Sequence, residues 1–578
     1  MFAPRLTPNA VRVLKARYLK KNPRGKVTET PQEMFMRVAR HVAQADNIYT
    51  TKNSLQKTEN TFYEMMARTE FLPNSPTLMN AGRELGQLAA CFVIPVEDSL
   101  DSIFEAVKIT ALIHQTGGGT GFSFSRLRPK DDPVAATGGV ASGPVSFMKV
   151  FNTGTEVIKQ GGTRRGANMG VLRVDHPDIL EFIGAKREPE ALSNFNISVA
   201  ITDKFMEAVE RDSTYPLINP RTGKAARRQR ARDVFRQITG AAWKTGDPGV
   251  LFIDRINDHN PTRPIAEIEA TNPCGEQPLQ PFEACNLGSI NLTKMLMKVG
   301  RDGYKIDYAK LSETILKGIH FLDNVIDVSR YPLPQIEAIT KANRRVGLGV
   351  MGFADMLIML GIPYNSEDAL TTIEELMSFF QIAAKDASFQ LAKERGTFPN
   401  FPQSIYYRSG SLPLRNATVT TIAPTGTISI IAGCSSGIEP LYAVSFVRNV
   451  LDDVKLSEIN PLFKKMAVRK GIYNKKLVSA ISSSESIQGI PSIPQDMKEL
   501  FVTAFDIPPV WHVRMQAAFQ KYVDNAVSKT INLPHSAGKK DVEDAYLEAY
   551  RLGCKGVTVF RSGSRKKQVL SCANVPYC

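Results

Sequence analysis

The chain has 578 residues, which is too long for a single small hydrophobic core. Its composition, 43% hydrophobic and 22% charged, is ordinary for a globular protein. Seven cysteines in this length exclude a disulfide-rich secreted scaffold, and no secretory signal opens the sequence, so we expect a cytoplasmic protein with reduced thiols. The formal charge of +15 suggests anionic ligands. No aromatic-interleaved motif accompanies the basic clusters, so we do not expect nucleic acid as a partner. We do not expect a membrane as a partner either.

The first stretch of about 70 residues has a helical pattern. Thr30–Glu33 matches a capping box with proline at the first helical position. One apolar face follows it, made by Met34, Val38 and Val42. We therefore expect residues 1–70 to form an N-terminal helical layer on a main body.

From residue 71 onward, short apolar runs alternate with amphipathic segments. Runs typical of strands span Ala89–Val96, Phe122–Ser125, Gly170–Val174, Phe195–Ile201, Val250–Ile253, Leu287–Leu292, Thr418–Ile422 and Gly556–Phe560. Helical segments between them span Asp101–His114, Val145–Lys159, Lys204–Arg211, Tyr308–Val328, Ser366–Glu394 and Val510–Ser528. This alternation indicates an α/β fold with a largely parallel sheet or barrel. We expect residues 71–561 to be one unit and residues 562–578 to be a flexible basic tail.

The most hydrophobic window, Val346–Tyr364, contains Asp355 and ends in Gly-Ile-Pro. It is therefore predicted to be a buried strand, turn and helix rather than a membrane span. Within it, Gly347–Gly352 matches the spacing GxGxxG. No acidic residue closes a convincing ribose site about 20 residues further on, because Glu374 and Glu375 lie too far along inside a helix, which argues against a dinucleotide site.

The segment Asn272-Pro-Cys-Gly-Glu276 has the clearest chemical content. If it is extended, alternate side chains project to one side, which brings together Asn272, Cys274 and Glu276. Pro273 keeps the preceding residue out of the helical region, and Gly275 leaves room between the reactive positions. A thiol between an amide and a carboxylate suits chemistry at adjacent hydroxyls of a small substrate. A plain turn that holds a buried cysteine explains these five residues equally well.

Two glycine-rich or hydroxyl-rich segments are candidates for contact with anions. Thr116–Gly121 contains three consecutive glycines, so its backbone can approach a ligand closely. Pro424–Ile428 follows an expected strand and offers two hydroxyls and unhindered amides, which suit a phosphate. For each segment alone, an ordinary turn is an equal alternative. The sequence contains no HExxH, ExxH or CxxC pattern, so no metal site is predicted.

Together these segments resemble a known family, the large chains of ribonucleotide reductases, and within it the adenosylcobalamin-dependent class II enzymes. The motifs that carry the resemblance are Leu72–Asn80, Ala90–Phe92, Glu97–Asp101, Arg164–Met169, Asn272–Leu279, Glu283–Leu292, Ala423–Ser429 and Gly553–Arg561. They extend in order from about residue 70 to residue 561. The resemblance implies a ten-stranded α/β barrel made of two five-stranded parallel halves, with a catalytic finger loop inside.

The resemblance also implies how the site works. Cys274 would carry a thiyl radical that abstracts the 3′-hydrogen of a ribonucleotide. Glu276 would take the proton of the 3′-hydroxyl, and Asn272 would hold the ribose hydroxyls. Cys91 and Cys285 would supply two electrons as a dithiol.

The resemblance also implies a redox-active cysteine pair in the tail, a substrate site and an effector site. The tail pair that would pass electrons from a thioredoxin-like reductant is Cys572 and Cys578. Substrate-binding positions would be Ser75, Ala90, Gly119, Pro424, Thr425, Gly426, Thr427 and Ile428. A specificity site for a dNTP effector would comprise Asp98, Ser99, Leu100 and Arg128. We also expect a homodimer, with Asp101–His114 and Val145–Lys159 as candidates for its interface.

The source of the radical divides this family into classes. The strand Thr558–Arg561 has no tyrosine pair, which disfavours a separate radical subunit, and the tail has no glycyl-radical motif. The expected cofactor is therefore adenosylcobalamin, and the expected substrates are ribonucleoside diphosphates. A reductase that depends on a radical subunit is the alternative. A catalytically silent nucleotide-binding regulator is a third possibility, and the intact set of three cysteines argues against it.

Overall fold

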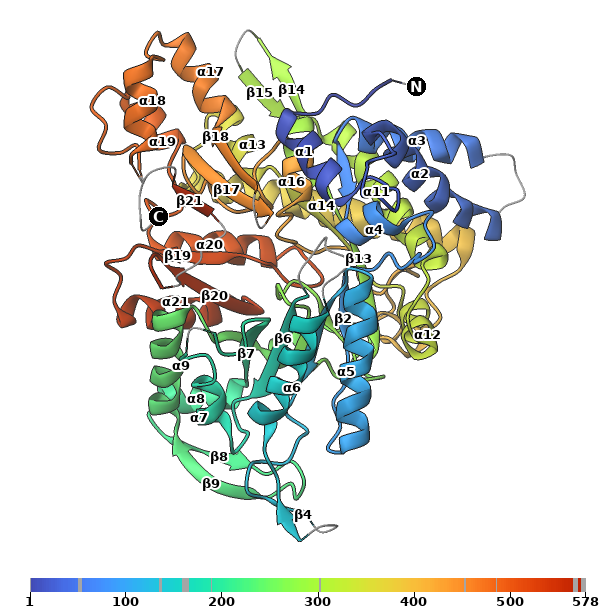
Figure 1. Ribbon diagram of the computed structural model, residues 1–578, viewed down its shortest axis with the longest axis vertical. Coiled ribbons are helices and arrows are strands. Elements are labelled where there is room, and N and C mark those ends of the chain that lie inside the picture. The colour runs from blue at the N-terminus through green and yellow to red at the C-terminus, as the bar shows by residue number, and fades with distance from the viewer. Residues whose placement is uncertain are drawn as a thin grey trace.

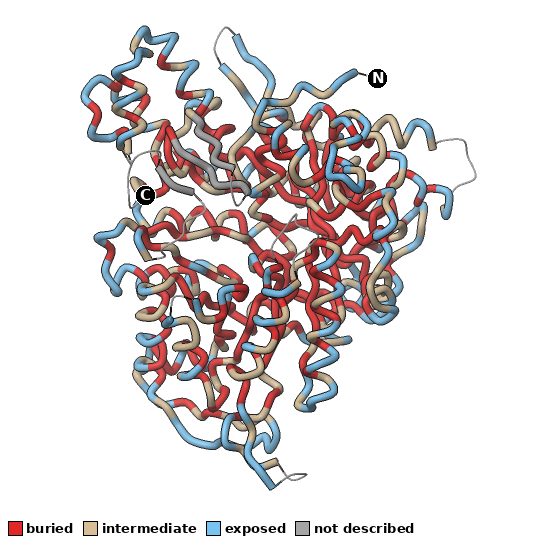
Figure 2. Tube along the Cα trace, in the orientation of Figure 1, coloured by how far each residue is buried: buried red, intermediate tan, exposed pale blue. Residues whose placement is uncertain are grey.

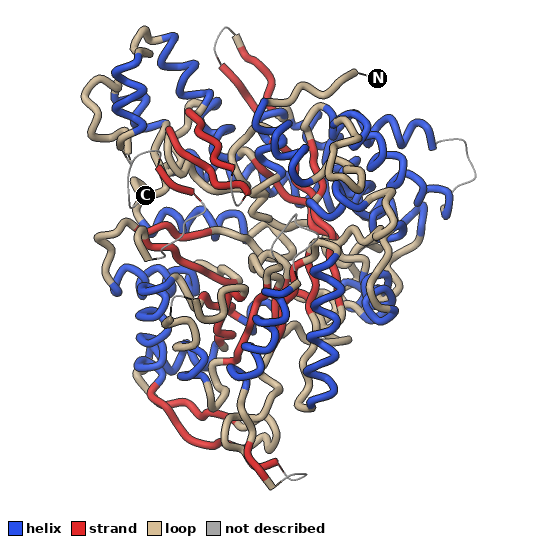
Figure 3. Tube along the Cα trace, in the orientation of Figure 1, coloured by secondary structure: helices blue, strands red, loops and turns tan. Residues whose placement is uncertain are grey.

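The structure is a computed structural model that describes residues 2–49, 55–134, 138–158, 166–188, 190–300, 303–451, 454–484, 486–564 and 570–572. Of these, residues 446–451, 454–458 and 570–572 are described by their backbone alone. Most strands pass through the middle of the molecule, and the helices surround them (Figure 1, Figure 3).

Five strands form the first half of a barrel. In order they are β2 (Cys91–Val93), β3 (Gly119–Ser123), β6 (Asn168–Arg173), β7 (Phe195–Ile201) and β10 (Gly249–Phe252). Each pairs in parallel with the next. Parallel strands covered on both faces are apolar along their whole length, which explains their continuous hydrophobic runs in the sequence.

The second half also has five members. It consists of β13 (Glu283–Asn291), β16 (Val346–Met351), the segment 420–422, the segment from Val527 into β19 (Thr530–Leu533), and β20 (Gly556–Arg561). Neighbours in this series are parallel throughout, although residues 420–422 join by single bridges to Leu348 and Val527.

The two halves meet in antiparallel pairs, and the circuit of strands closes. β10 pairs with β20 at Val250 and Val557, and β2 pairs with β13 at Cys91 and Cys285. β1 (Phe71–Pro73) adds to the far end of β13 outside this circuit. The expected ten-stranded barrel of two parallel halves is therefore confirmed.

Helices pack on the outside of the barrel. The principal ones are α5 (Leu100–Gln115), α6 (Pro144–Val157), α8 (Asp203–Glu210), α9 (Ala231–Thr245), α11 (Tyr308–Val328), α14 (Glu367–Arg395), α20 (Pro509–Gln520) and α21 (Lys539–Arg551). The shorter ones are α4 (Ser75–Asn80), α7 (Ile179–Ile183), α10 (Ile253–Asp258), α12 (Pro334–Asn343), α13 (Phe353–Leu360), α15 (Ile405–Arg408), α16 (Ile428–Ala432), α17 (Pro461–Arg469), α18 (Lys475–Ser482) and α19 (Gln495–Leu500).

The expected helix Val510–Ser528 is wrong over its last part. α20 ends at Gln520, and the chain then runs as a barrel strand at Val527. The change comes from contacts distant in the sequence. The carboxylate of Asp524 accepts a hydrogen bond from the Val419 N–H (2.8 Å), and the Asn525 amide donates to the Thr420 carbonyl (3.0 Å).

Small strands outside the barrel form hairpins and ribbons. They are β4 (Pro133–Val134), β5 (Gly139–Val140), β8 (Thr214–Ile218), β9 (Ala225–Arg230), β11 (Ala270–Thr271), β12 (Pro278–Leu279), β14 (Leu296–Val299), β15 (Gly303–Ile306), β17 (Ser445–Leu451), β18 (Val454–Ile459) and β21 (Leu570–Cys572). The basic cluster at Arg221–Arg232 includes the exposed strand β9. Three of its arginines form ion pairs, Arg221 with Asp132 and both Arg230 and Arg232 with Asp212.

The N-terminal layer begins with α1 (Pro8–Arg17), α2 (Pro31–Ala43) and α3 (Leu55–Ala67). Thr30 and Glu33 form the predicted capping box at the start of α2. The predicted apolar face of α2 is buried, as Met34, Val38 and Val42 have no exposed surface. The layer packs beside α4 and α11 (Figure 1).

The hydrophobic window predicted as strand, turn and helix has that structure in β16 and α13. Its glycines allow close packing between strands, because a Cβ atom on Gly349 would lie 2.1 Å from the Thr421 carbonyl oxygen. The described residues contain no helix of the length and apolar character that a membrane crossing needs.

Buried residues run through the middle of the molecule (Figure 2). Their apolar side chains form three large clusters and one small cluster around Phe398 and Phe401. One lies against β13, β16 and the N-terminal layer, and another lies against β3, β6, β7 and β10. The third lies inside the barrel and includes Cys91, Cys285, Val171, Leu251 and Leu287. The interior is thus a packed core that also holds two thiols.

Candidate active site

A hairpin carries the finger loop, residues 272–277, into the barrel. β11 and β12 pair at its base, and the N–H of Asn272 donates to the Gln277 carbonyl (3.1 Å) to close it. The Asn272 side-chain oxygen accepts from the Gln277 N–H at 3.0 Å. Gly275 has a φ of +82°, which favours glycine. The segment is therefore a turn, and the expectation of an extended chain with alternating side chains is wrong.

Strand β3 has glycine at the two positions where the finger loop passes. A Cβ atom on Gly121 would lie 1.8 Å from the Thr271 carbonyl oxygen, and one on Gly119 would lie 2.9 Å from the Pro273 ring. A real Cβ atom does not approach another heavy atom so closely. These glycines let the hairpin pack directly on the barrel wall.

The finger loop and the barrel enclose a cavity of about 270 Å³, which we call the first cavity. Despite the turn, Asn272, Cys274 and Glu276 all line it, together with Cys91. The other predicted residues on its wall are Ser75, Ala90, Gly119, Pro424, Thr425, Gly426, Thr427 and Ile428. The structure thus brings every sequence-predicted substrate residue to one space.

The two remaining thiols face each other across neighbouring strands. Cys91 of β2 and Cys285 of β13 are register partners, and both are buried. Opposite residues in an antiparallel pair have Cα atoms about 4.5–5.5 Å apart, which is within the range that a disulfide spans. Both thiols are in the reduced state in the structure, and the Asn272 amide donates to the Cys91 sulfur at 3.1 Å.

Burial raises the pKa of the Cys285 thiol well above its usual value, and the nearby charge of Glu283 acts in the same direction. The thiol is therefore protonated at neutral pH. Cys285 donates weakly to the carbonyl of Arg345, whose guanidinium pairs with Glu283 at 2.7 Å. Arg345 and Glu283 are themselves almost completely buried.

The segment 424–428 forms a cradle beside the finger loop. Thr425 has a φ of +55°, and its hydroxyl oxygen accepts a hydrogen bond from the Gly437 N–H at 2.6 Å. α16 begins at Ile428, so the backbone N–H groups before it belong to a helix start. Such groups suit an anion, in keeping with the predicted contact to phosphate.

Ser289 is a residue of the first cavity that sequence reasoning missed. It is 1% exposed, and its hydroxyl has no hydrogen-bond partner among the described residues. Cys285, Leu287 and Ser289 alternate along β13, so they share one face of the strand. This period of two was the signal in the sequence that pointed to Ser289.

Comparison with known families agrees with this geometry. The family described as "Ribonucleotide reductase, barrel domain" matches residues 89–413 and 408–560, and "Ribonucleotide reductase, all-alpha domain" matches residues 4–86. The chain belongs to the ribonucleotide reductase family.

Curated relatives refine this placement. The reductase is 49% identical to a "Vitamin B12-dependent ribonucleoside-diphosphate reductase" of Thermoplasma acidophilum, over 98% of this chain and 80% of that protein. It has the same identity and coverage with the protein of that name from Mycobacterium tuberculosis strain H37Rv. The predicted resemblance to the B12-dependent members is thereby confirmed, and the chain is an oxidoreductase of this family.

A solved structure extends the likeness to the fold. The alpha subunit of the class Id ribonucleotide reductase of Actinobacillus ureae matches with a TM-score of 0.78. The match covers 97% of this chain and 98% of that one at 24% identity, so it concerns the fold alone.

The reductase has a second cavity, of about 340 Å³, that meets the first at Pro273, Cys274 and Pro424. Its walls come from β7, β10, β20 and the segment 526–530. Asn196 of β7 donates to the Pro273 carbonyl at 2.8 Å and so holds the tip of the finger loop. The thiol of Cys274 is exposed, and it lies between the two spaces.

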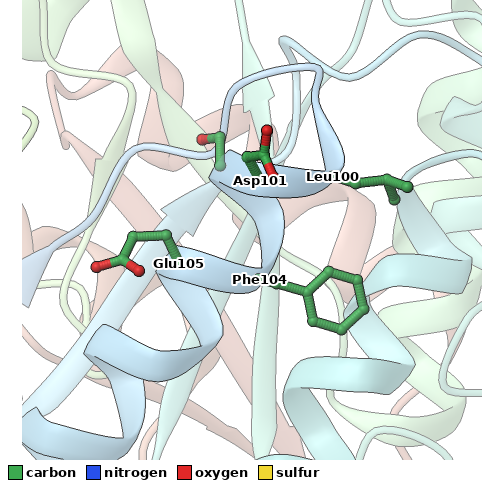
Figure 4. A pocket seen from close by; sticks show the side chains of 5 residues that line it. Leu100, Asp101, Phe104 and Glu105 are labelled. Carbon is green, nitrogen blue, oxygen red and sulfur yellow. The ribbon is translucent and has the colours of Figure 1, made fainter.

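The predicted effector residues of the reductase also assemble at one place. Arg128 pairs with Asp98 at 2.7 Å, and Ser99 caps the start of α5 through the Ser102 N–H. The adjoining hollow is lined by Leu100, Asp101, Ser102, Phe104 and Glu105. Figure 4 shows Leu100 and Phe104 extending to one side of α5 and Glu105 to the other. Leu100 is 64% exposed and Phe104 is 53% exposed.

The remaining cysteines of the reductase have varied positions. Cys554 is a buried thiol before β20, and burial raises its pKa to about 12. Cys434 is half-buried. The backbone of Cys572 pairs in β21 with β17. Cys578 and Arg164, the first residue of the motif Arg164–Met169, lie outside the described residues. In the described part, no group of three His, Cys, Asp or Glu side chains is arranged to hold a metal ion.

Proposed function

We propose that this reductase converts ribonucleoside diphosphates to 2′-deoxyribonucleotides for DNA synthesis and repair, by thiyl-radical chemistry at Cys274. The observation that supports it most is that two cysteines line one cavity and a third is the strand partner of one of them. Cys274 and Cys91 line the first cavity, and Cys285 lies opposite Cys91. One thiol can hold an unpaired electron, while the other two form a dithiol within reach of the same ligand.

The residues around the cavity divide the reaction between them. The Cys274 radical takes the 3′-hydrogen, and the Glu276 carboxylate accepts the proton of the 3′-hydroxyl while Asn272 holds the ribose. The 2′-hydroxyl then leaves as water with a proton from the Cys91–Cys285 dithiol. That dithiol supplies two electrons and two protons and becomes a disulfide, and Cys274 returns the hydrogen to C3′. In the overall reaction, a ribonucleotide and a dithiol give a deoxyribonucleotide, a disulfide and water.

The second cavity is the proposed location of the radical-generating part of adenosylcobalamin. The residues fit such a group, since Gly275 opens to space there and Gln516 presents a buried side-chain oxygen with no described partner on the wall. Homolysis of the cobalt–carbon bond is the chemistry that adenosylcobalamin supplies when bound. Cys274 is the residue that would give up a hydrogen atom, because it alone among the three active-site cysteines lines both cavities.

The remaining roles follow the same proposal. The tail cysteines Cys572 and Cys578 would carry electrons from a thioredoxin-like protein, because each turnover leaves a disulfide that must be exchanged. A dithiol that must be kept reduced favours the cytoplasm.

An effector and a homodimer complete the proposal. A dNTP would bind at Asp98, Ser99, Leu100 and Arg128, whose guanidinium suits phosphate. The exposed Leu100 and Phe104 beside them favour a homodimer through α5. Sedimentation velocity with and without a dNTP measures that assembly.

The decisive test is an assay of the purified protein with adenosylcobalamin, dithiothreitol and one ribonucleoside diphosphate, followed by chromatography of the product. We expect deoxyribonucleotide from the wild type and none from Cys274→Ser, which should still bind the nucleotide. Cys434→Ser is the control, since Cys434 lines neither cavity. Turnover by Cys274→Ser would refute the role of that thiol. Product that forms only with an added radical-generating protein would favour the alternative class.

A further inference from the structure

Lys529 is a charged residue with no role in the proposed chemistry. It lies on the wall of the second cavity, and its side chain has no exposed surface. The ammonium group donates to the Glu439 carboxylate at 2.6 Å, to the Thr530 carbonyl at 3.0 Å and to Nδ1 of His512 at 3.1 Å. All three of its N–H groups are therefore used.

Glu439 holds both the side chain and the backbone of this wall. One carboxylate oxygen accepts from Lys529, and the other accepts from the Thr530 N–H at 2.8 Å. The Nε2 of His512 lies 2.9 Å from the Ala504 carbonyl, so Nε2 carries the proton and donates it there. This leaves Nδ1 as the acceptor for the Lys529 ammonium group. Lys529 is completely buried, whereas the Glu439 side chain is 27% exposed. Burying the lysine charge costs solvation free energy, so the arrangement is not explained by stability alone.

Glu439 belongs to the loop that leads away from the phosphate cradle. The N–H of Glu439 donates to the Ser436 carbonyl, and the N–H of Gly437 donates to the Thr425 hydroxyl. A Cβ atom on Gly437 would lie 2.9 Å from the Ala423 carbonyl, so this loop packs tightly on the strand before the cradle. Thr425 in the first cavity is thus joined through one loop to Lys529 in the second.

We propose that the Lys529–Glu439 pair is a positioning element that couples nucleotide binding at the cradle to cofactor binding in the second cavity. The inference rests on the proposed function of the two cavities. A nucleotide phosphate that orders Thr425 also orders Gly437 and Glu439, and Glu439 then holds the segment 527–530. Coupling of this kind is reciprocal, so a ligand in either cavity tightens binding in the other by the same factor.

The test measures this factor without turnover. In a Cys274→Ser parent, calorimetry gives the Kd of GDP with and without saturating adenosylcobalamin, and the Kd of adenosylcobalamin with and without GDP. We expect each ligand to tighten the other by about fivefold or more in the parent, which is the lower end of measured couplings. With Lys529→Met added, we expect the factor to fall below about twofold while each ligand alone still binds.

A second variant separates positioning from stability. Lys529→Met leaves the partly exposed Glu439 carboxylate without its cation partner, which lowers stability. The double variant Lys529→Met/Glu439→Gln removes both charges and keeps an acceptor for the Thr530 N–H. If the double variant regains stability but its two ligands still bind without coupling, the inference is supported. If the coupling factor also returns to that of the parent, the inference is overturned.

Arg37→Met is the matched control. Arg37 is a buried cation paired with Glu29 at 2.7 Å in the N-terminal layer, and it lines neither cavity. It should lose stability and keep the coupling factor of the parent. Coupling that survives in Lys529→Met, or that falls equally in Arg37→Met, would overturn the inference. A parent that binds neither ligand would instead refute the proposed function.

Discussion

At the scale of single residues, the interior of the barrel shields polar side chains from water. Cys285 and Ser289 are on the same strand and are almost completely buried, but their situations differ. Cys285 donates to a backbone carbonyl and lies opposite Cys91, whereas the Ser289 hydroxyl has no described partner and faces the cavity. In the proposed function the first would take part in redox chemistry, and the second would bind a ligand.

Thiol reactivity should separate Cys274 from Cys285. Alkylation needs the thiolate, and burial both raises the pKa of Cys285 and blocks the reagent, whereas Cys274 is exposed. We expect iodoacetamide to label Cys274 first at pH 8 and to leave Cys285 unlabelled until urea unfolds the chain. Peptide mass spectrometry measures the order. Labelling of Cys285 in the folded protein at the rate of Cys274 would contradict the buried, protonated thiol.

Ser289→Ala should weaken substrate binding. A lost hydrogen bond of about 1 kcal/mol corresponds to a KM about fivefold higher, with kcat nearly unchanged. Steady-state kinetics with the deoxyribonucleotide assay checks this. Ser388→Ala is the control, because Ser388 is also buried but already bonds to Asn416 and lines neither cavity. An unchanged KM in Ser289→Ala would remove this serine from the binding site.

At the scale of elements, the finger loop depends on the strand it packs against. β3 and the hairpin of β11 and β12 are separated by more than a hundred residues, yet the hairpin backbone occupies the space that a side chain at Gly121 would need. The position of the Cys274 thiol is therefore set partly by the lack of a side chain on another strand. Catalytic geometry is sensitive to shifts of about 1 Å.

Gly121→Ala should displace the finger loop and lower activity. The new Cβ atom would meet the Thr271 carbonyl oxygen at 1.8 Å, so the hairpin must move. We expect kcat to fall by about a hundredfold or more, together with a lower melting temperature. Gly240→Ala is the control, since nothing lies within 4 Å of its added Cβ on α9. That variant should keep its activity and gain about 0.5–1 kcal/mol of stability.

At the scale of the whole molecule, buried charges join the N-terminal layer to the barrel helices. Asp46 accepts from His320 (2.8 Å) on α11 and from Arg395 (2.7 Å) on α14, and Arg395 also pairs with Asp323. Burial alone would raise the pKa of Asp46, but its hydrogen bonds from His320, Asn324 and Thr58 hold it below the ordinary 3.8. Burial likewise opposes ionisation of Asp323, and the charges of Arg344, Arg415 and Arg395 keep its pKa low.

These shifts predict an acid-sensitive fold. A carboxyl whose pKa is lower in the folded state adds stability above its unfolded pKa and loses it as pH falls. We expect Asp46→Asn to cost about 3 kcal/mol of unfolding free energy at pH 7, with the difference from wild type shrinking below about pH 4. Urea titrations from pH 7 to pH 3 measure it. Asp496→Asn, which breaks an exposed pair with Lys470, should cost less than about 1 kcal/mol at any pH.

The sequence alone was sufficient where structure depends on neighbours in the chain. The bounds of β7 and α11 agree with the predicted ranges, and the capping box at Thr30 formed as expected. Periodicity and caps are local, because they involve residues a few positions apart. The long motifs around Cys274 were enough to indicate the family and its B12-dependent branch, which the comparisons confirmed.

Only the tertiary structure decided what distant segments do to one another. It ended α20 at Gln520, joined the predicted strand at residues 420–422 to its neighbours by single bridges, and placed the turn at Cys274 between two cavities. It also joined Lys529 to Glu439 across 90 positions of the chain. No pattern in the sequence encodes such contacts by itself, because they exist only after the barrel closes and brings its strands to a common interior.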